Sequence, residues 1–156
     1  GSSDGLKLAA NIAAMLVAFV AFIALINYLL SFIEFNGQSV SIELLLGYLF
    51  MPLAWMMGAP WQESQSLGSL MGQKLVLTEM IAYINLSSME LSDRTAIIAS
   101  YALCGFANFA SIGIQLGGIG SIAPDRRKDL SKIVFKAMLG GALASWITAC
   151  IAGLLI

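Results

Sequence analysis

The side chains best suited to hold a polar ligand lie in an uncharged stretch, residues 105–121. Asn108 and Ser111 are three residues apart, so on a helix they would share one face, and Gln115 would extend that face by one turn. Amide and hydroxyl groups are costly at membrane depth unless they face protein or a water-filled path. The glycines of the stretch allow either a close helix contact or a break in the helix. We therefore predict a broken spanning helix over 94–121 with one polar face; a small-residue packing face held by amide hydrogen bonds is the alternative.

A second polar group of interest is the carboxylate of Glu79, which stands between the apolar triplet LVL and the sequence MIAY. About ten residues separate the polar segments on either side, too few to cross the hydrocarbon core of a bilayer. Two short arms joined near residues 77–79 would instead form a re-entrant hairpin, which we predict over 64–90 and which must be covered by protein or a cavity. An ionisable residue at that depth is a functional-site candidate, and the alternative is a carboxylate on an ordinary interfacial helix.

The composition places both stretches in a membrane protein. Of the 156 residues, 59% are hydrophobic and 11% are charged, whereas soluble domains contain about 25% charged residues. The chain is therefore predicted to be an all-α integral membrane protein that crosses the cell membrane (inner or plasma membrane) several times. Its net charge of −1 gives no indication of a nucleic-acid partner.

Several kinds of chemistry find no support in the sequence. It contains no histidine and no convincing pairing of a nucleophile with a base, so an enzyme is the least favoured class and no catalytic residue is predicted. Cys104 and Cys150 both lie in apolar runs, which argues against a disulfide framework. For the same reasons we predict no metal site and no cofactor.

Two long apolar segments predict complete spanning helices. The first occupies 4–33, with Lys7 near its start and Glu34 directly after its end. The second occupies 131–156 and finishes in the uncharged run 137–156. Each apolar run is at least as long as the roughly 20 residues needed to cross a bilayer.

A shorter apolar segment, 41–60, is predicted to be an interfacial helix. Pro52 near its middle and Trp55 near its end suit a helix that lies at the membrane surface, although a spanning helix is left open. Ser41 is the expected start of this helix, and Ser92 is expected to cap the helix that begins near residue 95, because serine side chains accept bonds from the first free amides.

The orientation follows from a basic segment, residues 125–132, which contains the densest group of cations in the chain: Arg126, Arg127, Lys128 and Lys132. Short loops rich in lysine and arginine stay in the cytoplasm. We therefore predict that this segment is a cytoplasmic loop, that the C-terminus lies outside, and that the hairpin around Glu79 enters from outside. A collar facing phospholipid would have the same orientation.

Two motifs resemble those of the concentrative nucleoside transporters. GQKLVLTEMIAY, residues 72–83, is similar to that family's Gly-x-Lys followed four residues later by Asn-Glu-Phe-Val-Ala. Four positions match, at Gly72, Lys74, Glu79 and Ala82, and three depart, at Thr78, Met80 and Ile81. CGFANFASIGIQLGGIGSIAPDRR, residues 104–127, closely resembles the second motif, and DGLKLAANIAAMLVAFVAFIALI, residues 4–26, resembles the family less specifically. Together the resemblance covers essentially the whole chain.

This resemblance implies a cation-coupled nucleoside symporter that works as a homotrimer in the bilayer, with sodium or a proton as the coupling ion. The family builds its transport core from two inverted repeats, each with a re-entrant hairpin and a broken helix. The chain would then be the C-terminal half, residues 1–156 forming the second repeat. Its partner would be the N-terminal half of the same transporter, which is expected to hold most of the ligands for the cation.

The resemblance also implies a site for the ribose of a uridine-like nucleoside, formed by Glu79 with Asn108 and Ser111. Ribose hydroxyls can donate to a carboxylate or an amide oxygen, and they can accept from an amide or a hydroxyl. Phe106 would form the apolar wall beside the sugar and base. Two alternatives stand beside this interpretation: a transporter of the same architecture for another polar solute, and a non-transporting membrane domain for nucleoside recognition or assembly. The residues leave open both the preferred nucleoside and the choice between sodium and proton.

Overall fold

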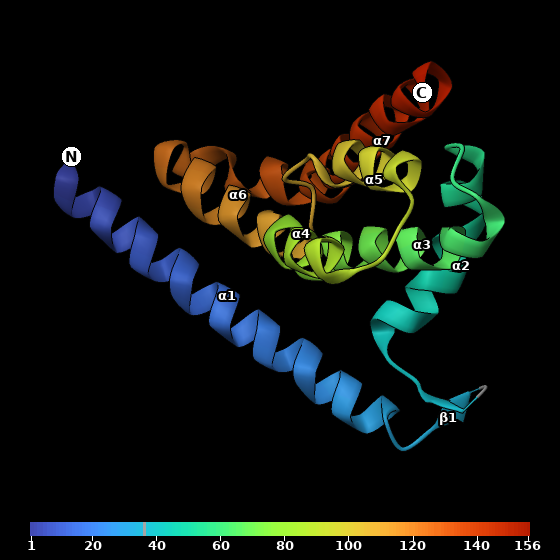
Figure 1. Ribbon diagram of the computed structural model, residues 1–156. Coiled ribbons are helices and arrows are strands. Elements are labelled where there is room, and N and C mark those ends of the chain that lie inside the picture. Colours follow the sequence, from blue (N-terminus) through green and yellow to red (C-terminus); the bar gives the residue numbers. More distant parts are fainter. Residues whose placement is uncertain (36) are drawn as a thin grey trace.

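The computed structural model describes residues 1–35 and 37–156, and within these ranges the chain is almost entirely helical (Figure 1). The elements in chain order are α1 (Ser2–Leu30), β1 (Glu34–Phe35), β2 (Gln38–Ser39), α2 (Ile42–Met56), α3 (Trp61–Val76), α4 (Glu79–Ser88), α5 (Asp93–Leu103), α6 (Phe109–Ile122), the 3₁₀ turn η1 (Pro124–Arg126) and α7 (Arg127–Leu155). The strands β1 and β2 form a two-residue antiparallel ladder, which the all-α prediction did not include.

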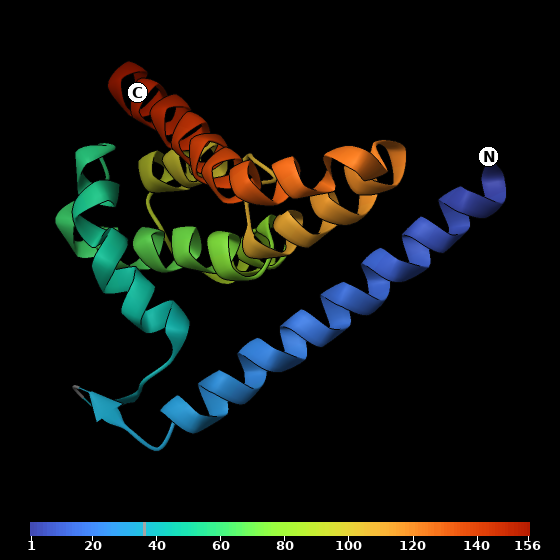
Figure 2. The ribbon, with the colours of Figure 1, turned by 180° about the vertical axis from the view of Figure 1, so that it is seen from behind.

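The first helix, α1, runs along one side of the other helices and packs little against them (Figures 1 and 2). Many of its large apolar side chains are exposed, and an apolar cavity of about 370 Å³ lies between α1 and α6. One polar link holds its end: Asn27 Nδ2 donates to both carboxylate oxygens of Glu43, at 3.1 and 2.9 Å, and Asn27 Oδ1 accepts from the amide of Ile42 at 2.9 Å. A helix that is apolar on all sides needs an apolar environment, which a bilayer supplies.

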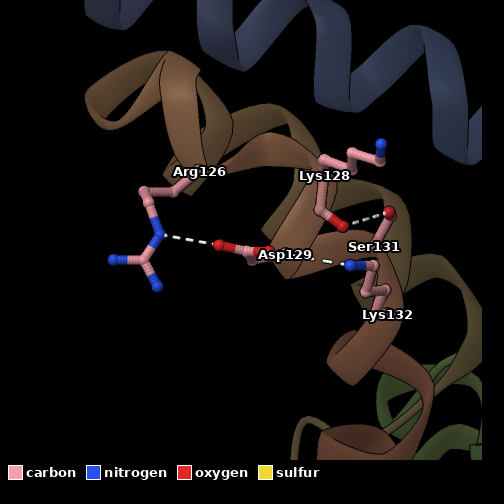
Figure 3. A network of polar contacts seen from close by, with 5 residues as sticks. All are labelled: Arg126, Lys128, Asp129, Ser131 and Lys132. Carbon is pink, nitrogen blue, oxygen red and sulfur yellow. Dashed lines mark hydrogen bonds and ion pairs between the residues drawn. The ribbon is translucent and has the colours of Figure 1, made fainter.

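By length and composition, two described helices could cross a membrane, Gly5–Leu30 and Pro124–Leu155. The second starts earlier than predicted, because α7 begins at Arg127 and so takes in most of the segment expected to be a loop. Figure 3 shows what stabilises this start: Asp129 accepts from Arg126 Nε at 2.9 Å and lies 3.9 Å from Lys132 Nζ. A carboxylate in the first turn of a helix also interacts favourably with the helix dipole.

The centre of the fold is the packing of α2 along α3. Gly68 makes close approach possible, because a Cβ there would lie 2.5 Å from the Gly47 carbonyl oxygen and 2.9 Å from the Met51 nitrogen. Leu67, Leu70 and Met71 of α3 are fully buried in the hydrophobic core. The helix α3 is therefore a core element, although its sequence is polar and mixed.

The helices α5 and α7 meet the turn between α2 and α3 at one end of the molecule. Gly153 has no room for a side chain, since a Cβ would lie 2.0 Å from the Met57 carbonyl oxygen. Arg94 donates from Nε to the Gly58 carbonyl at 2.8 Å and from Nη2 to the Gly153 carbonyl at 2.6 Å. The predicted cap of α5 is confirmed, because the Ser92 side chain accepts from the backbone amide of Thr95.

Two breaks interrupt the helices near the middle of the chain. The first covers residues 77–78, between α3 and α4, and the second covers residues 104–108, between α5 and α6. The α3–α4 pair packs against α5, and α6 packs against α7. These breaks bring the predicted site residues to helix ends.

Candidate functional site

The two breaks place two helix N-termini beside each other. Glu79 is the first residue of α4, and Asn108 is the N-cap of α6. Asn108 Nδ2 donates a hydrogen bond to Glu79 Oε2 at 3.2 Å. Helix N-termini carry partial positive charge, and Glu79 is an acidic residue in the first turn of α4. The structure thus joins a carboxylate and an amide that are far apart in the sequence.

Asn108 and Ser111 do not form the helical face that their spacing predicted. Asn108 has an extended backbone (φ −144°, ψ 167°) and caps α6, and Ser111 is the third helical residue. Asn108 Oδ1 accepts from the Ser111 amide at 2.8 Å, while Ser111 Oγ donates to the Asn108 carbonyl at 2.6 Å. Asparagine and serine are favoured at such caps because they satisfy amides that lack a helical partner. Both side chains are only 1% exposed, and their cap fixes the direction of the Asn108 amide.

The remaining polar residue of the predicted face, Gln115, lies elsewhere. It lines a separate, mostly apolar cavity of about 140 Å³ between α6 and the first half of α7. The predicted polar face is therefore not continuous, since the helix begins only after Asn108. Phe106, inside the second break, is 61% exposed, so its ring can cover a ligand beside Asn108.

Sequence reasoning gave no role to Lys74, although the structure makes it a central residue. Its side chain is 0% exposed, and Nζ donates to Ser145 Oγ at 2.8 Å and to the Ala102 carbonyl at 3.4 Å. The available signal was an ammonium group in an apolar run, which requires a buried partner. Nearby, Asn85 Nδ2 donates to Gln73 Oε1 at 2.6 Å and joins α4 to α3.

The arrangement can bind a ligand rich in hydroxyl groups. Glu79 Oε1 has no hydrogen-bond partner among residues 1–35 and 37–156, and an ionised carboxylate accepts strongly from a hydroxyl. The Asn108 amide has a second N–H, which can donate to a ligand oxygen. Within the described ranges no group of three or more histidine, cysteine, aspartate or glutamate side chains gathers as a metal site would.

Comparisons with known proteins agree on one family. The family model described as "Na+ dependent nucleoside transporter C-terminus" matches residues 1–153. Uncharacterized transporter YutK of Bacillus subtilis (strain 168) is 50% identical over 160 residues, covering 100% of this chain and 40% of YutK. Solute carrier family 28 member 3 of Mus musculus is 41% identical over 174 residues, covering 99% of this chain and 25% of that protein.

Solved structures give the same result for the fold. A variant of CNTnw in its intermediate 2 state has a TM-score of 0.89 and 42% identity, covering 100% of this chain and 40% of that structure. CNTnw in an inward-facing substrate-bound state has a TM-score of 0.81 and 42% identity, covering 99% of this chain and 38% of that structure. The chain therefore spans well under half the length of these relatives.

Proposed function

This chain belongs to the family of Na⁺ dependent nucleoside transporters, and from that premise we propose that it forms the ribose-binding half of a cation-coupled nucleoside symporter. The α3–α4 pair would be the re-entrant hairpin and α5–α6 the broken helix of one inverted repeat. The N-terminal half of the transporter would supply the other repeat and most ligands of the coupling cation, for which the family name supports sodium. We propose that three copies of the complete transporter assemble in the membrane.

The observation that carries this proposal is the hydrogen bond between Asn108 and Glu79, at 3.2 Å, across the two breaks. A ribose hydroxyl can donate to the Glu79 carboxylate while another accepts from the Asn108 amide. A hydrogen bond to a carboxylate is short and strong, so the sugar would be held by its hydroxyls. The exposed ring of Phe106 would cover the apolar side of the nucleoside.

The substitution Glu79→Gln in the full-length transporter tests this site. Loss of one charge-assisted hydrogen bond should weaken uridine binding by about 1.5–3 kcal/mol, or roughly tenfold to 150-fold in Kd. The loss should shrink for the deoxy analogue that lacks the contacted hydroxyl, because there is then less bonding to lose. Dissociation constants for uridine, 2′-deoxyuridine and 3′-deoxyuridine measure this directly.

Glu90→Gln is the matched control, because Glu90 is exposed in the loop between α4 and α5. It should leave all three dissociation constants unchanged. If Glu79→Gln weakens the three ligands equally, or weakens none, Glu79 does not contact the ribose. A full-length protein without saturable nucleoside binding would favour the alternative, a non-transporting membrane domain.

We infer the orientation of the chain from its basic segment. Residues 125–132 would face the cytoplasm and Ile156 the outside, because cationic segments are retained inside. An impermeant thiol reagent applied to intact cells should leave an Asp125→Cys variant unlabelled, with Cys104 and Cys150 replaced by alanine. Strong labelling at that position would mean that the orientation is the opposite of the proposed one.

A further inference from the structure

The C-terminal end of α5 shows how the second break is held open. The last four carbonyls of a helix have no partner within it and must find other donors. Two of them are satisfied locally: the Tyr101 carbonyl accepts from the Cys104 amide at 3.2 Å, and the Leu103 carbonyl accepts from the Gly105 amide at 2.8 Å. The nearby backbone therefore satisfies only two of these four carbonyls.

The other two carbonyls accept from side chains of the α3–α4 pair. The Tyr83 hydroxyl donates to the Ser100 carbonyl at 2.7 Å, and Lys74 Nζ donates to the Ala102 carbonyl at 3.4 Å. Lys74 also donates to Ser145 Oγ at 2.8 Å, and that hydroxyl donates in turn to the Ala142 carbonyl of α7 at 3.0 Å. One ammonium group thus joins α3, the end of α5 and α7.

A buried ammonium is unfavourable unless negative charge compensates it. Lys74 lies beside a helix end that supplies such charge. The C-terminal end of a helix carries partial negative charge, and cations are stabilised there. Among the described residues, the ion pairs found involve Asp129 with Arg126 and Lys132, and none involves Lys74. The Ala102 carbonyl at the helix end and the Ser145 oxygen are therefore its hydrogen-bond partners, and the more distant Glu79 carboxylate adds an electrostatic attraction.

The second break passes directly over this ammonium. A Cβ at Gly105 would lie 3.0 Å from Ser145 Oγ and 3.4 Å from Lys74 Nζ. Phe106 and Asn108 come soon after Gly105 in the sequence. The position of their backbone therefore depends on the contact between Gly105 and the Lys74 ammonium. A shift of the ammonium would move these two side chains.

In inverted-repeat transporters, the C-terminal ends of half-helices and unwound carbonyls coordinate the coupling cation. We propose that Lys74 is a positioning residue that acts as a built-in cation at the end of α5. Its ammonium occupies the place that a monovalent ion would take, and it holds the second break in the shape that presents Phe106 and Asn108. The coupling sodium then has no free carbonyl at this half-helix. This inference rests on the proposed function for what it says about nucleoside binding.

Chemical rescue in the full-length transporter tests the inference. Lys74→Ala removes three methylene groups and the ammonium, a fragment that propylammonium replaces in size and charge. We expect Lys74→Ala to weaken uridine binding at least tenfold, and we expect propylammonium, but not tetramethylammonium, to restore it. Lys74→Met fills the space without charge. Its uridine binding should be weakened similarly, and propylammonium should not restore it. Lys136→Ala, an exposed lysine of α7, is the matched control and should behave as wild type.

A second measurement does not depend on nucleoside. Without ligand, the Tm of Lys74→Ala should rise with propylammonium, because a molecule that binds only the folded state stabilises it. The sodium concentration that gives the half-maximal rise in Tm should be the same in Lys74→Met as in wild type, since methionine fills the space of the lysine side chain and the coupling sodium binds elsewhere in both proteins. Wild type that binds no uridine would refute the proposed function, while these Tm measurements would still test Lys74.

Three outcomes would overturn the inference. Uridine binding by Lys74→Met within threefold of wild type would mean that the ammonium is not needed. A changed sodium response in Lys74→Met would mean that Lys74 belongs to the coupling site. If both variants lose uridine binding equally and propylammonium restores neither, Lys74 acts only through packing. Should Lys74→Ala fail to fold, Lys74→Met decides by its uridine Kd and its sodium response.

Discussion

The two helix breaks of this chain end alike but begin differently. Each ends in an N-cap side chain, Thr78 at the first break and Asn108 at the second. The first break is short. At the end of α3 the Leu77 amide donates to the Gln73 carbonyl at 2.7 Å, and among the described residues no side chain of another helix donates to a carbonyl there. The second break is longer, and the end of α5 depends in addition on Lys74, which comes from another helix.

This difference assigns separate roles to the two breaks. A break that receives no side-chain donor from another helix depends less on where its neighbours lie. A break whose carbonyls accept from other elements keeps its geometry only while those elements stay in contact. The first break can therefore act as the fixed side of the site, through Glu79, and the second as the side whose shape is set by packing. Substitutions at the second break should have the larger effects.

The largest effect is expected for Asn108→Ala. It removes both the cap of the Ser111 amide and the donor to Glu79. Loss of an N-cap lowers the free energy of unfolding by about 0.5–2 kcal/mol, and uridine binding should fall at least tenfold. Asn108→Ser separates the two roles, because serine still caps a helix but is too short to reach Glu79. It should recover most of the stability and little of the binding; equal recovery of both would contradict this division.

A smaller effect is expected for Thr78→Ala at the first break. Thr78 Oγ1 accepts from the Ile81 amide at 3.4 Å, a long bond. The free energy of unfolding should fall by about 0.5–1 kcal/mol, and uridine binding should fall less than in Asn108→Ala. Thr78→Ser should restore both quantities. A Thr78→Ala variant that binds more weakly than Asn108→Ala would show that the first break, not the second, controls the site.

The smallest effect is expected far from both breaks, at Glu63 near the start of α3. Hydrogen bonds from the side chains of Thr95 and Ser92 hold the pKa of the Glu63 carboxyl below its ordinary value of 4.5. A lowered pKa stabilises the fold above the ordinary value, and this contribution is lost as pH falls through the lowered pKa. Glu63→Gln should therefore reduce Tm slightly at pH 7, and this reduction should disappear as the pH falls through the lowered pKa. Glu63→Gln should leave uridine binding unchanged at every pH. A tenfold loss of binding would mean that the site includes this end of α3.

The sequence by itself determined the membrane class and the family. Low charge and long apolar runs require a bilayer, because no water-soluble fold can bury so much apolar surface with so few charged groups. The cap at Ser92 was also readable, since serine followed by an acidic first turn starts helices by local chemistry. Glu79 could be singled out for a similar reason: a carboxylate in an apolar run is unfavourable anywhere except at a site that uses it.

Only the tertiary structure decided how the polar groups are paired. Spacing placed Asn108 and Ser111 on one helical face, but the helix begins after Asn108, so they cap it instead. Whether Lys74 is buried depends on where α5 stops and on which helices pack around that end. A helix end leaves carbonyls without partners, and the side chains that reach them come from residues far away in the sequence. Periodicity describes neighbours along one helix, and it contains no information about donors that another helix supplies.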